Sequence, residues 1–155
     1  MRTKKLVTAA VIASVYAVAT IAVAPLSYGL MQIRISEALT ILPMFTPAAI
    51  PGLFIGCLIA NIISPIGLVD VVLGSLATLL AAYGSYKFRK HKWLVPLPPI
   101  IANGVVIGWM LYYIYGVDVS LMACMLWVAG GEAVACYGIG MPLIMALDKR
   151  KEMFK

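Results

Sequence analysis

Long apolar stretches, separated by short clusters of charge, dominate the pattern of this chain. The stretch 119–147, for example, contains a single charged residue, Glu132. An α-helix needs about 20 residues to cross a hydrocarbon core of roughly 30 Å. We therefore predict four membrane-spanning helices, at residues 6–24, 71–86, 95–115 and 119–147.

The segment 38–69 also lacks charge, but proline and glycine interrupt it. We predict two short helices there, at 38–50 and 53–63, joined at Pro51-Gly52. A re-entrant hairpin is the alternative. Both arrangements return the chain to the side on which the segment begins.

Basic residues set the orientation, because cytoplasmic loops of membrane proteins are enriched in Lys and Arg. They form three groups: Arg2, Lys4 and Lys5; Lys87, Arg89, Lys90 and Lys92; and Lys149, Arg150, Lys151 and Lys155. The chain crosses the membrane an even number of times between one group and the next, so all three groups lie on the same side, the cytoplasm. The predicted fold is an all-α integral membrane protein, a six-transmembrane-helix bundle with both termini cytoplasmic, forming a single domain over residues 1–155. The first apolar run exceeds the ~7–15 residues of a signal-peptide core, so we interpret it as a span.

Composition supports a membrane protein and narrows its chemistry. The chain is 63% hydrophobic and 12% charged, against roughly 45–50% and 25% in soluble domains. The net charge of +6 comes from basic residues at the positions where the predicted topology places cytoplasmic loops and ends. This distribution accounts for the charge, so no nucleic-acid partner is expected. The sequence has one His and lacks Walker A, G-x-S-x-G and H-E-x-x-H motifs, so we predict no cofactor, no metal and no catalytic residue. We interpret Cys57, Cys124 and Cys136 as buried packing residues.

Polar residues of the predicted spans and of their outer ends fall in the outer half of the bilayer. A lone intramembrane carboxylate costs about 2.5–3.5 kcal/mol on insertion scales, which makes Glu132 a functional candidate. The structural alternatives are an i,i+3 surface pair for Arg34 and Glu37, a helix cap for Asp70, and interhelical packing for the asparagines. The candidate substrate-binding residues of this group are Arg34, Glu37, Asn61, Asp70, Asn103 and Glu132.

Aromatic residues add a second set of candidates near the same depth. Trp109, Tyr112, Tyr113 and Trp127 could stack on a flat ligand. The alternative is a belt of aromatic residues at the membrane interface.

Small residues at a spacing of four line the first span: Ala9, Ala13 and Ala17. Such a stripe lets another helix backbone approach closely. We expect it either to dock a partner helix or to pack inside the bundle.

Two motifs carry a resemblance to a known family. The stretch QIRISEALT at 32–40, followed by Leu42-Pro43, and the pattern N-x-x-S-P-x-G-x-x-D at 61–70 resemble the signature of the QueT family. These proteins are predicted queuosine-precursor transporters, the substrate-binding (S) components of energy-coupling-factor (ECF) transporters.

The resemblance implies six helices, a bacterial plasma-membrane location and a micronutrient bound from outside. It also implies three partner subunits, a transmembrane coupling protein and two ATPases, with Ala9, Ala13 and Ala17 matching the docking motif. The implied cargo is a 7-deazaguanine, such as 7-cyano- or 7-aminomethyl-7-deazaguanine, or queuine. The alternatives are an S component for another cationic heterocycle such as thiamine, a membrane-embedded enzyme, or a structural helix bundle.

Overall fold

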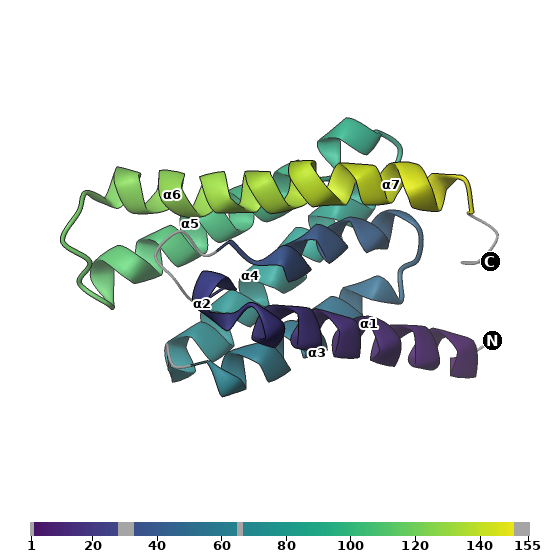
Figure 1. Cartoon of the computed structure of the whole chain (residues 1–155), viewed down its shortest axis with the longest axis horizontal. Helices are drawn as coiled ribbons and strands as arrows, with labels where there is room; N and C mark the ends of the chain where they lie inside the picture. The colour runs from purple at the N-terminus through teal and green to yellow at the C-terminus, as the bar shows by residue number, and fades with distance from the viewer. Residues whose placement is uncertain (1, 28–32, 65–66, 151–155) are drawn as a thin grey trace.

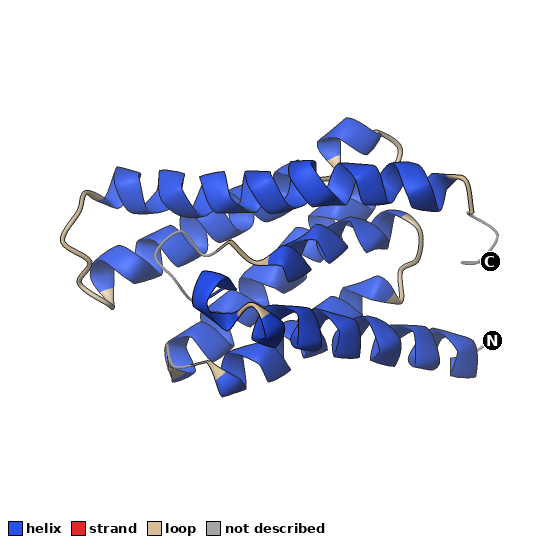
Figure 2. Cartoon of the chain, in the orientation of Figure 1, coloured by secondary structure: helices blue, strands red, loops and turns tan. Residues whose placement is uncertain are grey.

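The structure, a computed structural model, describes residues 2–27, 33–64 and 67–150. All regular elements in these residues are helices (Figure 2). In chain order they are α1 (Arg2–Ala22), α2 (Ala24–Ser27), η1 (Ile35–Met44), α3 (Ala49–Ile63), α4 (Leu68–Lys87), η2 (Lys92–Leu94), α5 (Leu97–Tyr113), α6 (Leu121–Ala133), η3 (Val134–Gly140) and α7 (Met141–Asp148). The elements η1 and η2 are 3-10 helices, and η3 is a π-helix.

Within the described residues, four helical segments are long and apolar enough to cross a membrane: Arg2–Ala22, Leu68–Lys87, Lys92–Tyr113 and Leu121–Asp148. They confirm apolar helices at the four long spans predicted from the sequence. The last segment joins α6, η3 and α7 into 28 residues. At 1.5 Å per residue it measures about 42 Å, so it is long enough to tilt in the bilayer or to project from it.

The predicted junction at Pro51-Gly52 is wrong. The first short helix, η1, already ends at Met44, and α3 begins at Ala49, so Pro51 lies inside the first turn of α3. Proline is tolerated there because the first N–H groups of a helix have no intrahelical acceptor. The chain therefore turns between Phe45 and Ala48, before the proline that seemed to break it.

The short helix η1 lies inside the bundle, between α1 and the segment formed by η3 and α7 (Figure 1). It packs against η3, α4, α1 and α3. Ten residues at about 2.0 Å each make it roughly 20 Å long. A 3-10 helix has poorer hydrogen-bond geometry than an α-helix, and irregular backbone at membrane depth is tolerated where protein covers it. The surrounding helices provide that cover.

Helices α1 and α3 run side by side in very close contact. A methyl group added at Gly52 would lie 2.7 Å from the Ala9 carbonyl oxygen, and one added at Gly56 would lie 2.7 Å from that of Ala13. Ala13 and Ala17 are accordingly buried. Ala13 and Ala17 of the predicted alanine stripe therefore pack within the chain, with glycines spaced by four on the facing helix, whereas Ala9 is partly exposed.

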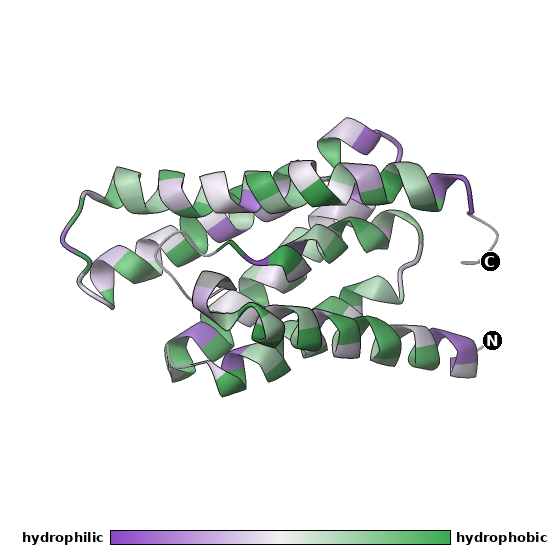
Figure 3. Ribbon diagram, viewed as in Figure 1, coloured by the Kyte–Doolittle hydropathy of each residue, from purple (hydrophilic) through white to green (hydrophobic). Residues whose placement is uncertain are grey.

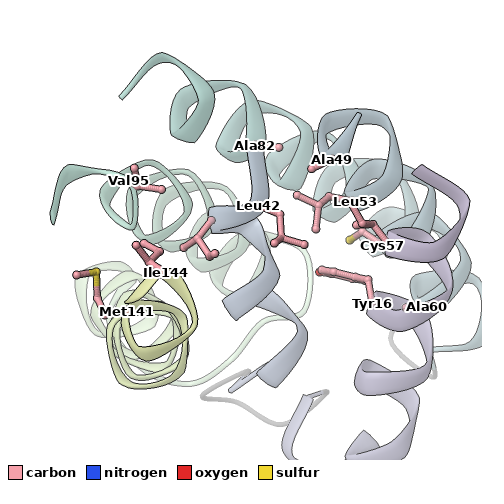
Figure 4. Close-up of a cluster of buried hydrophobic side chains, with 12 residues drawn as sticks. Tyr16, Leu42, Ala49, Leu53, Cys57, Ala60, Ala82, Val95, Met141 and Ile144 are labelled. Carbon is pink, nitrogen blue, oxygen red and sulfur yellow. The ribbon is translucent and has the colours of Figure 1, made fainter. Parts of the chain in front are cut away.

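Two clusters of buried apolar side chains form the core. The larger joins α1, η1, α3, α4 and α7 through residues such as Tyr16, Leu42, Leu53 and Ile144 (Figure 4). The smaller lies between α5 and α6 and comprises Ile107, Met110, Leu111, Cys124 and Val128. All three cysteines are buried and free.

The outer surface of the bundle is apolar, whereas hydrophilic residues mark the end at which both termini lie (Figure 3). Large hydrophobic side chains such as Val18, Ile62 and Leu80 are exposed on α1, α3 and α4, as expected where helices face lipid. Helix α1 begins and α7 ends at the same end of the bundle (Figure 1). Lys92 of the α4–α5 connection forms an ion pair with Asp148 at the end of α7. The described residues of the three basic groups thus lie at one end of the bundle. The number of six spans and the cytoplasmic location of the termini stay predictions.

Candidate functional site

The six polar candidates from the sequence are all buried, each with 4% or less of its surface exposed. Five helical segments and one connection supply them. They are Arg34 before η1, Glu37 in η1, Asn61 in α3, Asp70 in α4, Asn103 in α5 and Glu132 in α6. We call this set, with the hydrogen-bonded side chains around it, the polar cluster.

Arg34 is the centre of one half of the polar cluster. Its guanidinium group donates to Asp70 Oδ2 at 3.2 Å and to Asn61 Oδ1 at 3.1 Å, and its Nε donates to the Ser27 carbonyl at 3.3 Å. Both partners of the ion pair are buried, so each depends on the other to offset the loss of hydration. Asp70 lies in the first turn of α4, where Gly67 and not Asp70 occupies the N-cap position.

Asn61 connects α3 to α4 beside this ion pair. Its side-chain amide donates to the Asp70 carbonyl at 3.0 Å and lies 3.4 Å from Cys57 Sγ, which also accepts from Thr78 Oγ1 at 3.3 Å. A methyl group on Gly74 would lie 2.8 Å from both Asn61 Nδ2 and Asp70 Oδ1. Glycine at this position therefore lets the two side chains meet.

Glu37 is the centre of the other half. The Tyr16 hydroxyl of α1 donates to Glu37 Oε1. One turn further along α1, Thr20 hydrogen-bonds with Ser36 at 2.6 Å. Glu37 Oε2 is buried and has no hydrogen-bond partner among the described residues.

Glu132 approaches from α6. It accepts a 2.8 Å hydrogen bond from Asn103 Nδ2 of α5, and Cys136 Sγ lies 3.9 Å from its second oxygen. Cys136 Sγ also lies 3.5 Å from the Glu37 carbonyl oxygen. One thiol thus contacts both acidic residues, Glu37 at its backbone carbonyl and Glu132 at its carboxylate. The π-helix η3 begins two residues after Glu132, and π-helical turns often occur at functional sites.

The part of the polar cluster around Tyr16 and Asp70 lies away from the basic end, whereas Asn103 is only six residues into α5, which begins near that end. Tyr16 is 14 residues beyond the first residue of α1, about 21 Å along the helix axis. Asp70 lies in the first turn of α4, whose last turn holds the basic Lys87.

The aromatic candidates lie elsewhere. Trp109, Tyr112, Tyr113 and Trp127 are each more than a third exposed. Trp109 and Tyr112 contact the ring of Tyr113 at centroid distances of 5.4 and 4.9 Å. The structure therefore does not bring these four rings together with the polar cluster, and their positions suit an interfacial belt.

A groove of about 810 Å³ opens at the opposite, basic end. Small and apolar residues of α1 and α3 line it, with two basic side chains at its rim: Arg2, Lys5, Leu6, Ala9, Ala10, Ala13, Pro47, Ala48, Pro51 and Ile55. Two members of the alanine stripe, Ala9 and Ala13, belong to the groove, whereas Ala17 does not.

Comparison with known proteins assigns the family. The sequence matches the QueT transporter family over residues 6–149. The chain belongs to the QueT transporter family. It is also similar to a protein of Lactococcus lactis subsp. cremoris (strain MG1363) described as "Queuosine precursor transporter QueT", with 37% identity over 81 residues. That alignment covers 51% of this chain and 47% of the relative, so it spans about half the length of each. No solved structure matches.

Membership in the QueT family, together with the apolar helices, makes the chain a multi-pass membrane protein of the bacterial cell membrane. It also favours the transport class over the membrane-embedded enzyme. Of the family-like motif residues, Arg34, Glu37, Asn61 and Asp70 meet in the polar cluster. Gln32 and Pro65, like the basic residues Lys151 and Lys155, lie outside the described residues.

Sequence reasoning missed several members of the polar cluster. Tyr16 is fully buried and bonded to Glu37, yet it lies in a long apolar run without any charge. The sequence feature that could have indicated Tyr16 is a phenol group one helical turn before Thr20, in a part of α1 that is otherwise almost entirely aliphatic. Cys57 and Cys136 are buried as predicted, but they contact polar groups of the cluster as well as the apolar core.

Proposed function

We propose that this QueT family member is the substrate-binding component of an ECF transporter and that it imports a queuosine precursor of the 7-deazaguanine class. The observation that supports this most is the convergence of six buried polar side chains from helices far apart in sequence. Burying such groups in an apolar bundle is costly, so a transporter retains them where a ligand uses them.

The polar cluster offers the groups that a 7-deazaguanine requires. A carboxylate accepts from the ring N–H and the exocyclic amine, and an amide or guanidinium group donates to the carbonyl oxygen. Glu132 with Asn103 supplies one such combination, and Arg34 with Asn61 supplies further donors. Substrate enters from the side away from the basic groups and displaces some of the internal hydrogen bonds.

Binding to the purified protein tests this function. We expect 7-aminomethyl- or 7-cyano-7-deazaguanine to bind saturably in isothermal titration calorimetry, and Glu132→Gln to weaken that binding at least tenfold. Asp118→Asn, in the α5–α6 connection outside the cluster, is the matched control and should leave binding unchanged. Binding of thiamine instead of both deazaguanines would assign the chain to another vitamin. Turnover of a bound compound would identify an enzyme.

The proposed function also includes partners, a transmembrane coupling subunit and two ATPases. The groove between α1 and α3 is the proposed docking surface, supported by its small, apolar lining and its place at the basic end. Within the alanine stripe, Ala9 and Ala13 contribute to this surface together with the exposed Ala10. Because Ala17 packs inside the bundle, its contribution to docking is to keep α1 close to α3.

A bulky residue in the groove tests docking separately from binding. Ala10→Trp should preserve ligand binding by the isolated chain but abolish uptake in cells that supply the partner subunits. Val11→Trp is the matched control, because Val11 is exposed on α1 without lining the groove. Normal uptake by the Ala10 variant would exclude this groove as the docking surface.

A further inference from the structure

The groove between α1 and α3 is open to the lipid of the membrane when the chain is on its own. We infer that it is a binding site for one anionic phospholipid. The phosphate group of this lipid lies between Arg2 and Lys5, and one acyl chain lies along the groove. The groove shares no residue with the polar cluster, so this site goes beyond the proposed function.

The length of the groove matches one leaflet of a bilayer. Its α1 residues run from Arg2 to Ala13 in the i, i+3, i+4, i+7 pattern of a single helix face. The eleven steps between these two residues cover about 17 Å at 1.5 Å each. Half of a hydrocarbon core of roughly 30 Å is about 15 Å. An acyl chain whose headgroup lies at the basic end therefore reaches as far as Ala13, the last α1 residue of the groove.

The lining of the groove suits a hydrocarbon chain. Apart from Arg2 and Lys5, every lining residue is apolar, and four of them are alanines, whose single methyl groups leave the groove wide. Leu6 is 70% exposed and Ile55 is 45% exposed, so both offer apolar surface to a neighbour. The volume of about 810 Å³ lies within the range of roughly 300–1,000 Å³ for ligand sites. No water is available inside the hydrocarbon core, so an acyl chain fills this space.

The charges at the rim select an anionic headgroup. Arg2 and Lys5 form no ion pair with an acidic side chain of the described residues, and the first turn of α1 contains no acidic residue. A helix N-terminus carries partial positive charge and N–H groups without intrahelical acceptors, so it is unfavourable for basic side chains. A phosphate group would bind both cations and offset this repulsion.

The lipid and the proposed coupling subunit use the same groove, so they bind in turn. The lipid fills the groove of the isolated chain and leaves when the coupling subunit docks. Binding of the lipid does not require the coupling subunit or the substrate. The inference can therefore fail while the proposed function holds, and the reverse.

Native mass spectrometry of the delipidated full chain in detergent counts bound lipids directly. The chain is titrated with phosphatidylglycerol or with phosphatidylcholine of identical acyl chains, which has the phosphate but no net charge. We expect one phosphatidylglycerol to bind about 25-fold more tightly than phosphatidylcholine, roughly fivefold for each of the two basic residues. Equal affinity for the two lipids would overturn the selection by charge.

Charge-matched double variants locate the site. Arg2→Gln with Lys5→Gln should reduce the affinity for phosphatidylglycerol to that for phosphatidylcholine. Lys87→Gln with Lys90→Gln removes the same charge at the end of α4 and just after it, and should leave the affinity within about threefold. Equal weakening by both double variants would mean a general attraction to the basic end and would overturn the site.

A bulky side chain tests the path of the acyl chain. Ala10→Trp fills the groove and should abolish binding of both lipids, whereas Val11→Trp, on α1 outside the groove, should leave it unchanged. Unchanged lipid binding by the Ala10 variant would overturn the placement of the acyl chain. Deazaguanine binding by the same proteins tests the proposed function separately, because it depends on the polar cluster and not on the groove.

Discussion

The contact between α1 and α3 predicts a large effect from a very small substitution, Gly56→Ala. The added methyl carbon would lie 2.7 Å from the Ala13 carbonyl oxygen, 2.9 Å from Tyr16 Cβ and 3.0 Å from Ala13 Cα. Ordinary contacts begin near 3.4 Å. Two of these atoms belong to the backbone, so α1 must move by about 0.7 Å, the difference between 2.7 and 3.4 Å.

Overpacking of this kind costs about 1–3 kcal/mol. Replacing glycine by alanine within a helix favours folding by up to about 1 kcal/mol. Subtracting that gain leaves a loss in the free energy of unfolding of roughly 0–2 kcal/mol, and the rigid backbone atoms at this contact favour the upper part of the range. Moving α1 also moves Tyr16 away from Glu37, so we expect ligand affinity to fall together with stability.

Gly130→Ala is the matched control, because the methyl group it adds to α6 has no atom within 4 Å. Thermal unfolding followed by tryptophan fluorescence in detergent measures both variants. The Gly56 variant should unfold at a lower temperature than the wild type, and the Gly130 variant at the same or a higher temperature. Equal unfolding temperatures for the two variants would refute the close approach of α1 and α3.

Three further predictions concern other parts of the molecule. Arg34→Met should lower the free energy of unfolding by about 3–5 kcal/mol, because it leaves a buried carboxylate unpaired, and Asp70→Asn in the same chain should recover part of the loss in chemical denaturation. Trp109→Leu should leave ligand affinity unchanged in calorimetry, since this ring is 43% exposed on the outer surface. Lys92→Ala should change stability by less than about 1 kcal/mol, because its ion pair with Asp148 is partly exposed to solvent. A loss of several kcal/mol would show that this pair holds the α4–α5 connection in place.

The long helices could be predicted from the sequence because hydropathy and charge act over whole segments. The predicted spans 6–24 and 71–86, for example, overlap α1 and α4 over most of their length. The polar cluster could be predicted for a related reason. A group such as Glu132 or Asn61 is unfavourable in an apolar helix unless it has a partner, so its presence alone indicates a site.

The short elements could not be predicted, because hydropathy does not distinguish a 3-10 or π-helix from an α-helix. The end of η1 and the start of α3 depend on tertiary packing, and Pro51 can either break a helix or begin one. The partners within the cluster were also hidden, since Tyr16 and Glu37 are separated by 21 residues and Asn103 and Glu132 by 29. The aromatic residues remained ambiguous because interfacial belts and ligand pockets use the same side chains.

The position of η1 has a consequence for the synthesis of the protein. Thr40 of η1 contacts Cys136 of η3, which lies 96 residues later in the chain. At a translation rate of about 5–20 residues per second, the ribosome needs roughly 5–20 s to produce the helix that covers it. During that interval η1, with its carboxylate and hydroxyl groups, can pack against α1, α3 and α4 but not against η3. The packing around η1 is therefore completed only after η3 has been made.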